Sequence, residues 1–281
     1  MPIRYYSKTE IAGIRRAGQV VMAILEELRR AVRPGVTTAA LDALAVRELK
    51  RHGATSNFKG YAPVKGVKPF PGVICASVNS AIVHGIPGSY ALREGDIISL
   101  DFGAVVDGWH GDSAITVPVG TISPEARRLL DVTQEALRRG IAAARGGSRV
   151  MDISRAIQTY VEGEGFSLIR QYTGHGIGRA LHEEPTVPNV VEPRGANPLL
   201  RPGMVMCIEP MVSTGKPTTR ELPDRWTVVT ADGSLAAHFE HTVAITTSEP
   251  EVLTARVDPV ADAVAASSAS LTSAPDAQKR P

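Results

Sequence analysis

Residues 101–112, with the sequence DFGAVVDGWHGD, decide the fold. The Asp107-Gly108 pair between apolar residues is a strong signal for a two-residue hairpin turn. Pairing back from that turn puts Gly103 opposite Asp112, which makes Asp101 the diagonal neighbour of Asp112. Diagonal neighbours lie roughly 7–8 Å apart, and residues two apart on a strand share a face. The two carboxylates therefore converge and repel unless a proton or a cation compensates them; taken alone, they could also lie on a solvated face.

The composition provides a full core and shows no strong charge bias. The chain has 281 residues, 43% of them apolar, and a net charge of +2. It contains no dense run of Lys and Arg, and no apolar run near the roughly 18 residues of a membrane span. The sequence therefore predicts neither a specific nucleic-acid reader nor a membrane protein. Cys75 and Cys207 form no Cys-x-x-Cys motif, which favours a reducing cytoplasm over a disulfide framework.

The chain runs twice from two helices into a group of strands. Capping signals at Ser7 and at Thr37 or Thr38 predict the first two helices, and Ser123 and Ser148 predict the second two. The strands of the first group are expected at residues 73–78, 96–106 and 109–119. Those of the second group are expected at residues 167–172, 204–212, 226–230 and 238–246, with a further hairpin turn at Asp232-Gly233.

One offset of 112 residues relates the two groups, since it pairs Gly35 with Gly147 and Gly53 with Gly165. We therefore expect an α+β fold of two related halves whose antiparallel strands join in one sheet. The helices would cover one face, and the other face would carry the site. Chance similarity between amphipathic helices is the alternative.

The composition changes after residue 248. Residues 249–281 contain no aromatic residue and consist mostly of Ala, Ser, Pro, Asp and Val. Such a segment buries too little apolar area to offset the entropy of ordering it. We predict a single domain over residues 1–248 and a disordered tail over 249–281, with a helix around residues 255–266 as the competing interpretation.

Four carboxylates lie in or beside apolar strand runs, where charged residues are rarely buried unless they are paired or bind a metal. They are Asp101, Asp112, Glu209 and Glu240, and the glycine-flanked His175 accompanies them. This oxygen-rich set suits Mn, Fe, Co or Zn in a two-metal site with bridging carboxylates. It does not suit a structural zinc site of Cys and His.

Together with GHGIGR at residues 174–179 and HEEP at residues 182–185, this set resembles the methionine aminopeptidases, most of all their short type I form. The resemblance covers roughly residues 7–247. It implies the pita-bread fold, in which two pseudo-symmetric halves surround a dinuclear metal site. Two divalent ions would be held by Asp101, Asp112, His175, Glu209 and Glu240. Of these residues, Asp112 and Glu240 would bridge both ions.

The resemblance also implies the groups that act on the substrate. His84 and His182 would hydrogen-bond the peptide carbonyl and the developing oxyanion, and Glu209 would be the general base toward a metal-activated water. The methionine pocket, with His84 at its edge, would consist of Tyr61, Cys75 and Trp226. The implied reaction removes the N-terminal methionine from nascent proteins and peptides whose second residue is small. We expect a cytoplasmic monomer with at most a weak association with the ribosome.

Three features depart from the family pattern, but none removes a ligand. They are Leu181 in place of a common Phe, a longer loop at residues 62–71, and the tail. A proline-specific aminopeptidase of the same fold is an alternative function, although those relatives carry an N-terminal domain for which a helix beginning near Ser7 leaves no room. A pita-bread protein that only binds partners is a second alternative, which the complete ligand set disfavours.

The remaining reactive side chains have structural interpretations. His110 and His241 adjoin ligands on strands, so their side chains face away from the site. Cys75 and Cys207 are interpreted as small core residues rather than nucleophiles. The chain lacks a Gly-x-Ser-x-Gly elbow, which disfavours a covalent mechanism.

Overall fold

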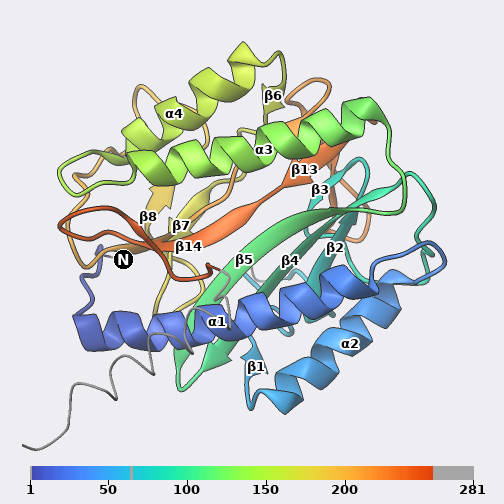
Figure 1. The fold of residues 1–281 in the computed structure, drawn as a ribbon, viewed down its shortest axis with the longest axis horizontal. Helices are drawn as coiled ribbons and strands as arrows, with labels where there is room; N and C mark the ends of the chain where they lie inside the picture. The colour runs from blue at the N-terminus through green and yellow to red at the C-terminus, as the bar shows by residue number, and fades with distance from the viewer. Residues whose placement is uncertain (1, 64–65, 256–281) are drawn as a thin grey trace, which may run out of the picture.

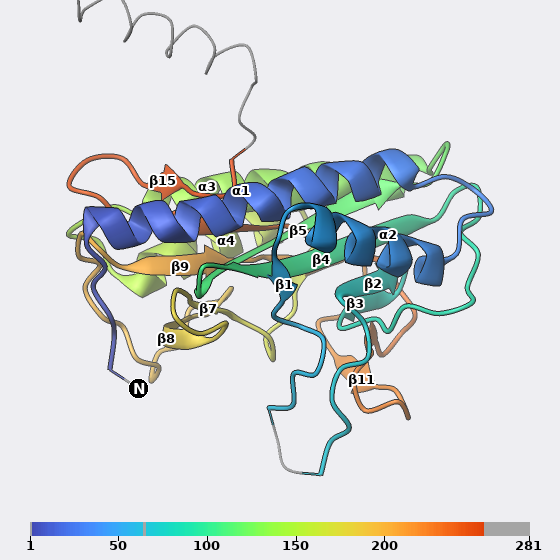
Figure 2. The ribbon, with the colours of Figure 1, turned by 90° about the horizontal axis from the view of Figure 1, so that it is seen from below.

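Within residues 2–63 and 66–255, which the computed structural model describes, four helices cover one face of a central antiparallel sheet (Figures 1 and 2). The helices are α1 (Lys8–Ala31), α2 (Thr38–Arg51), α3 (Pro124–Ala143) and α4 (Val150–Gly163). Figure 2 shows all four on one side of the sheet, with β11, which belongs to a separate small sheet, on the other side. Among the described residues, no helix combines the length and the hydropathy that a membrane crossing requires.

Three of the four predicted helix caps are present. The Ser7 hydroxyl accepts a hydrogen bond from the Glu10 N–H at 3.3 Å, and the Glu10 carboxylate accepts one from the Ser7 N–H at 2.9 Å. The Thr37 and Ser123 hydroxyls accept hydrogen bonds from the N–H groups of Ala40 and Ala126 and so cap α2 and α3. The prediction for Ser148 was wrong, because α4 begins after Arg149, whose N–H donates to the Asp152 carboxylate at 2.8 Å.

The central sheet has nine strands in the described part of the chain. Its main path runs through β1 (Thr55–Ser56), β4 (Ile97–Val106), β5 (Trp109–Pro118), β14 (Glu240–Ala244), β9 (Val205–Ile208), β7 (Gly174–Gly176) and β8 (Glu183–Val187). In addition, β2 (Ile74–Val78) pairs with β4, and β15 (Glu251–Val252) pairs with β14. The sheet thus spans both halves of the chain.

The β4–β5 hairpin has the predicted turn and register. Asp107 and Gly108 both have positive φ, at 51° and 74°, as a type I′ turn requires. Gly103 lies opposite Asp112, as expected. Alternate residues of β4, such as Leu100 and Phe102, are fully buried in the core under the helices. Asp101 lies between these two residues, and neighbouring side chains on a strand point to opposite faces of the sheet, so the Asp101 side chain lies on the open face.

The two halves repeat each other with the predicted offset of 112 residues. Adding 112 to the bounds of α2, 38–51, gives those of α4, 150–163. The same offset relates β1, at 55–56, to β6 (Ser167–Leu168). Gly35 and its counterpart Gly147 both have positive φ, at 86° and 92°. The halves meet where β5 pairs with β14. The prediction of two related α+β halves is therefore confirmed.

Two three-stranded sheets, which the sequence did not predict, supplement the central sheet in the described residues. One contains β6, β10 (Met211–Ser213) and β13 (Ala236–His238). The other contains β3 (Ala81–Val83), β11 (Thr219–Glu221) and β12 (Val228–Thr230). The turn at Asp232-Gly233 connects β12 to β13, which lie in different sheets, so the predicted second hairpin is wrong.

The run predicted as one strand over residues 204–212 is interrupted. It divides at Glu209-Pro210 into β9 and β10, which pair in different sheets. Proline has no N–H to donate to a ladder, which accounts for the interruption. As a consequence, Glu209, which the sequence predicts to be a site residue, lies at the break and not inside a strand.

The domain also extends past the predicted boundary at residue 248. Val252 of β15 lies opposite Val243 of β14, and both Leu253 and Thr254 are fully buried. The Gln19 side chain donates to the Leu253 carbonyl at 2.8 Å. The predicted boundary was therefore too early, and the domain reaches at least Ala255. The predicted tail over residues 256–281 and its competing helix lie outside the described residues.

Candidate active site

A cavity of about 370 Å³ opens on the sheet face away from the helices. Its lining includes every residue that the sequence predicted for the site, which are Tyr61, Cys75, His84, Asp101, Asp112, His175, His182, Glu209, Trp226 and Glu240. The structure thus brings together residues from both halves of the chain. Their individual roles as ligands, base and substrate contacts stay predictions.

Strand alternation positions the five predicted ligands. Asp101 and Asp112 lie on β4 and β5, and His175 lies at the middle of β7. Glu240 is the first residue of β14, which pairs with β5 through Glu240 and Ala114. Glu209 follows β9 directly at the proline break. Each ligand comes from a different strand or strand end, so the site exists only in the assembled sheet.

The carboxylate cluster is buried and incompletely paired. Asp112 is 4% exposed and Glu240 is 2% exposed. Asp112 Oδ1, Glu240 Oε1 and Asp101 Oδ1 have no hydrogen-bond partner among the described residues. Burying charged oxygen atoms without partners is costly unless a proton or a metal compensates them. The donor set, with its oxygen atoms and one imidazole, fits divalent cations.

Burial dominates the electrostatics of the cluster. It raises the pKa of Asp101 to about 7 and the pKa of Glu209 to about 8. The pKa values of Asp112 and Glu240 are also raised well above the ordinary range, by burial first and by the neighbouring carboxylates second. Burial lowers the pKa of His175 to about 3, which keeps its imidazole neutral. A neutral imidazole is the form that ligates a metal.

Two further imidazoles line the cavity beside the carboxylates. His182 Nδ1 lies 2.7 Å from the Tyr61 hydroxyl, and its ring centroid lies 4.3 Å from that of His175. His84 has a φ of 59°, a strained backbone conformation for a residue other than glycine. Its ring packs edge-on against Tyr172 and Trp226. Burial lowers the pKa of His84 to about 4, so this imidazole is also neutral.

An aromatic wall forms the other side of the cavity. The rings of Phe70 and Trp226 meet edge-on with centroids 5.2 Å apart. The Trp226 indole N–H donates to the Lys68 carbonyl at 2.9 Å, which fixes the indole against the longer loop. Leu181 also lines the cavity and is 6% exposed. The wall leaves an apolar recess next to the polar cluster.

A buried polar network holds the segment that carries His182. Glu183, 7% exposed, accepts hydrogen bonds from the Tyr6 hydroxyl at 2.7 Å and from the N–H groups of Arg179 and Ala180 at 2.9 and 3.0 Å. Burial and this carboxylate raise the pKa of Tyr6 to about 12. The N-terminal segment therefore positions the loop before His182, a role that the sequence did not reveal.

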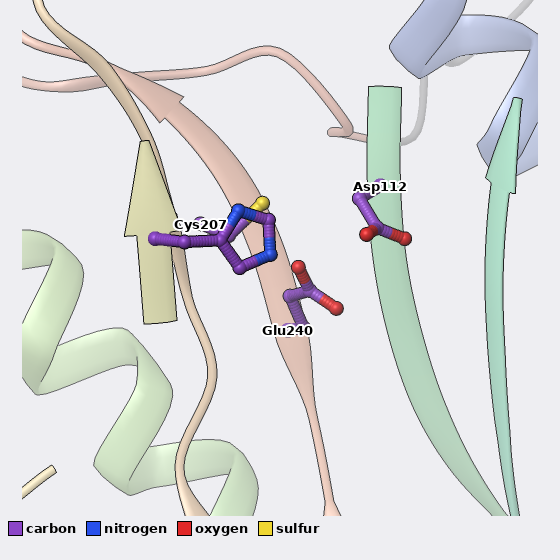
Figure 3. Close-up of side chains that lie close together, drawn as sticks. Asp112, Cys207 and Glu240 are labelled. Atoms are coloured by element: carbon purple, nitrogen blue, oxygen red, sulfur yellow. The ribbon is translucent and has the colours of Figure 1, made fainter. Parts of the chain in front are cut away.

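Two residues that could ligate a metal or take up a proton lie at the site, although they were not predicted to belong to it. His238 is 1% exposed, and its Nε2 lies 3.5 Å from Glu209 Oε2. Cys207 offers a sulfur atom within 4.8 Å of ligand atoms of Asp112, His175 and Glu240, as Figure 3 illustrates for the two carboxylates. The sequence contained a signal for Cys207. It lies two residues before Glu209 in the run predicted as one strand, and residues two apart on a strand share a face. Its apolar neighbours made it look like a core residue.

The prediction that His110 and His241 face away from the site is confirmed for His241 only. His241 lies on the helix side of the sheet, where its Nδ1 is 2.9 Å from the Thr254 hydroxyl. His110 lies two residues before Asp112 on β5, and residues two apart on a strand share a face, so its side chain lies on the open side of the sheet. There its Nδ1 is 3.4 Å from the Asn57 amide nitrogen. Neither histidine lines the cavity.

Comparisons with known proteins place these features in a family. The sequence pattern of metallopeptidase family M24 matches residues 12–247. The chain is 50% identical to methionine aminopeptidase 1 of Bacillus subtilis over 245 residues. The matched region covers 87% of this chain and 96% of that protein. The structure of a methionine aminopeptidase from Thermotoga maritima matches with a TM-score of 0.86 and 41% identity, over 91% of this chain and 100% of that one. A prolidase from Pyrococcus furiosus shares the fold, with a TM-score of 0.70, 22% identity, and coverage of 90% of this chain and 66% of the prolidase.

Proposed function

The chain belongs to metallopeptidase family M24, and on that premise we infer that it is a metal-dependent aminopeptidase that removes N-terminal methionine from polypeptides. The observation that carries this inference is the cavity, where a buried carboxylate–imidazole cluster lies beside an apolar aromatic wall. The cluster suits divalent ions, and the wall suits an unbranched apolar side chain. The two features together suit a peptide bond next to a terminal methionine.

We propose that two divalent ions are held by the five predicted residues, Asp101, Asp112, His175, Glu209 and Glu240. Asp112 and Glu240 lie on the paired strands β5 and β14 at the junction of the two halves, which supports the proposal that both side chains would contribute to holding both ions. Such ions lower the pKa of bound water from 15.7 to about 7 and stabilise the charge that develops on the carbonyl oxygen.

Within this site, Glu209 is our candidate for the general base. Its Oε1 lies 3.7 Å from His175 Nε2, and its Oε2 lies 3.5 Å from His238 Nε2. Placed next to these two imidazoles, the carboxylate could accept a proton from a water molecule and pass it to the leaving amine. We propose His84 and His182 as hydrogen-bond donors to the substrate carbonyl. If the Tyr61 hydroxyl donates to His182 Nδ1, the ring keeps its N–H at Nε2 for that task.

The recess formed by Tyr61, Cys75 and Trp226, together with Phe70, would hold the methionine side chain. A missing methylene in such a recess gives only about 1–3 kcal/mol of discrimination, so rejection of other terminal residues should be moderate. We propose that the second residue must be small, because it lies between His84 and His182 at the polar end. The N-termini of nascent chains in the cytoplasm are the expected substrates, and two free cysteines agree with that compartment. A monomeric state and a weak ribosome association stay predictions.

The experiment uses the metal-stripped full chain, re-supplied with one divalent metal at a time. We expect methionine release from Met-Pro-Ile-Arg, which matches residues 1–4, and very little from Met-Arg-Ile-Arg. Full activity without metal would refute the metal site, and equal cleavage of both peptides would refute the small-residue rule.

A proline-specific peptidase is the second candidate, because the fold is shared with a prolidase. The same assay separates the two functions. Cleavage after Pro2, or removal of residues other than methionine ahead of proline, would favour the proline-specific activity.

A further inference from the structure

Cys207 places a sulfur atom among the oxygen and nitrogen donors of the site. Its Sγ, one oxygen each of Asp112 and Glu240, and a His175 nitrogen all lie within 4.8 Å of one another. Figure 3 shows Cys207 together with Asp112 and Glu240. We propose that these four atoms form a site for one thiophilic divalent cation, such as Zn²⁺ or Cd²⁺, that overlaps the catalytic metal centre. The inference rests on the proposed function, because three of the four donors are also proposed catalytic ligands.

The strand positions explain why the sulfur points into the site. Cys207 lies on β9 opposite Thr242 of β14, and its Sγ is 3.6 Å from the Thr242 hydroxyl. Its neighbours Met206 and Ile208 are buried in the core under α3 and α4. Side chains alternate along a strand, so Cys207 faces the same side of the sheet as the catalytic cluster. The side chain is fully buried, which holds the sulfur in this place.

A four-coordinate zinc ion needs its donors closer together than the four atoms lie here. Zinc ligands lie about 2.0–2.3 Å from the ion in a tetrahedral arrangement, so two of its donors are about 3.3–3.8 Å apart. The four donor atoms of this site lie within 4.8 Å of one another, so side-chain movements of about 1 Å would bring them into place. Asp112 Oδ1 and Glu240 Oε1 are buried and have no hydrogen-bond partner among the described residues, so both can accept a cation.

The sulfur changes which metal the site prefers. Carboxylates suit Mn²⁺ or Mg²⁺, whereas a thiolate favours Zn²⁺ and other soft ions. Coordination replaces the S–H bond of Cys207 by a sulfur–metal bond, and the proton leaves to solvent. Cys75 provides a matched comparison, since it is also a buried free cysteine, lines the cavity and lies opposite Asp101 on β4, but is not part of the four-donor group.

The test is a Co²⁺ titration of the metal-stripped full chain, read by absorption in the near ultraviolet. We expect a sulfur-to-cobalt charge-transfer band in the wild type, its loss in Cys207→Ser, and its retention in Cys75→Ser. In direct competition, Cys207→Ser should also lower the preference for Zn²⁺ over Mn²⁺ by on the order of 10- to 100-fold. Circular dichroism checks the fold, and Cys207→Ala replaces the serine variant if that variant misfolds.

The outcomes separate this inference from the proposed function. A wild type that cleaves Met-Pro-Ile-Arg with Mn²⁺ but shows no charge-transfer band overturns the role of Cys207 alone. A band that survives in Cys207→Ser overturns it as well. If the wild type binds no divalent ion and releases no methionine, the proposed function fails and this inference fails with it.

Discussion

The substitution Leu253→Ala should destabilise the protein without touching the catalytic face. Leu253 is fully buried, and its carbonyl accepts the Gln19 hydrogen bond that ties the segment after β15 to α1. Removing a buried leucine side chain costs about 2–5 kcal/mol, because the transfer free energy is lost and a cavity remains. A domain of this size loses roughly 2–4 °C of melting temperature per kcal/mol. We therefore expect a decrease of about 4–20 °C.

The assay is thermal unfolding followed by circular dichroism, at one fixed metal concentration because bound ions shift melting temperatures. Chains ending at Ala255 and at Thr247 serve as comparisons. The first keeps every described contact and should melt like the full chain, whereas the second lacks β15 and Leu253 and should melt at least as early as Leu253→Ala.

The result that would refute the reasoning is a Leu253→Ala melting temperature within about 1 °C of the wild type. A large decrease in the chain that ends at Ala255 would also contradict it, because stability would then depend on residues beyond the described ones. In either case the burial of Leu253 would not be what holds the segment.

Three further predictions address the site. His182→Ala should lower kcat by on the order of 10²–10³ while metal content, measured by elemental analysis, stays the same; loss of metal would contradict its assignment as a substrate contact. Tyr6→Phe should lower the free energy of unfolding in urea by about 1–3 kcal/mol, because the buried Glu183 carboxylate loses a donor, and an unchanged midpoint would count against the network. The melting temperature of chelator-treated protein should fall as pH rises from about 5 to 8. Burial raises the pKa values of Asp101 and Glu209 to about 7 and 8, so the folded state keeps protons on both carboxyl groups that the unfolded state releases. A melting temperature that rises over this pH range would refute the prediction.

Local chemistry made the hairpin predictable. Asp107-Gly108 determines the turn type, the turn type determines the register, and the register puts Asp101 and Asp112 on one face. The four carboxylates could be predicted as site residues because each is a charged residue in or beside an apolar strand run. Their convergence with His175 could be expected only through the family resemblance, since no local pattern relates strands that are far apart in the chain.

The features that the sequence analysis missed share a physical cause: the side chains have the same apolar or neutral character as the residues around them in the sequence. Cys207 and His238 lie in apolar or mixed strand runs, where a thiol or a neutral imidazole looks like core. Leu253 follows Val252 near the start of a segment that is rich in Ala, Ser, Pro and Asp, so an average over residues 249–281 conceals it. The break at Glu209-Pro210 had a visible signal in the proline, but the apolar residues on both sides suggested one continuous strand.

The pairing of β5 with β14 has a consequence for the timing of synthesis. The first half of the chain supplies Asp101 and Asp112, and the partners that complete the cluster come from the second half, with Glu240 as the last. A chain still being made therefore carries two acidic side chains that are destined for burial but have no cation site. We expect the ability to retain metal to appear only after residue 240 has left the ribosome. An isolated fragment of residues 1–122 should accordingly retain no divalent ion on dialysis, and the enzyme would become active only after both halves have been made.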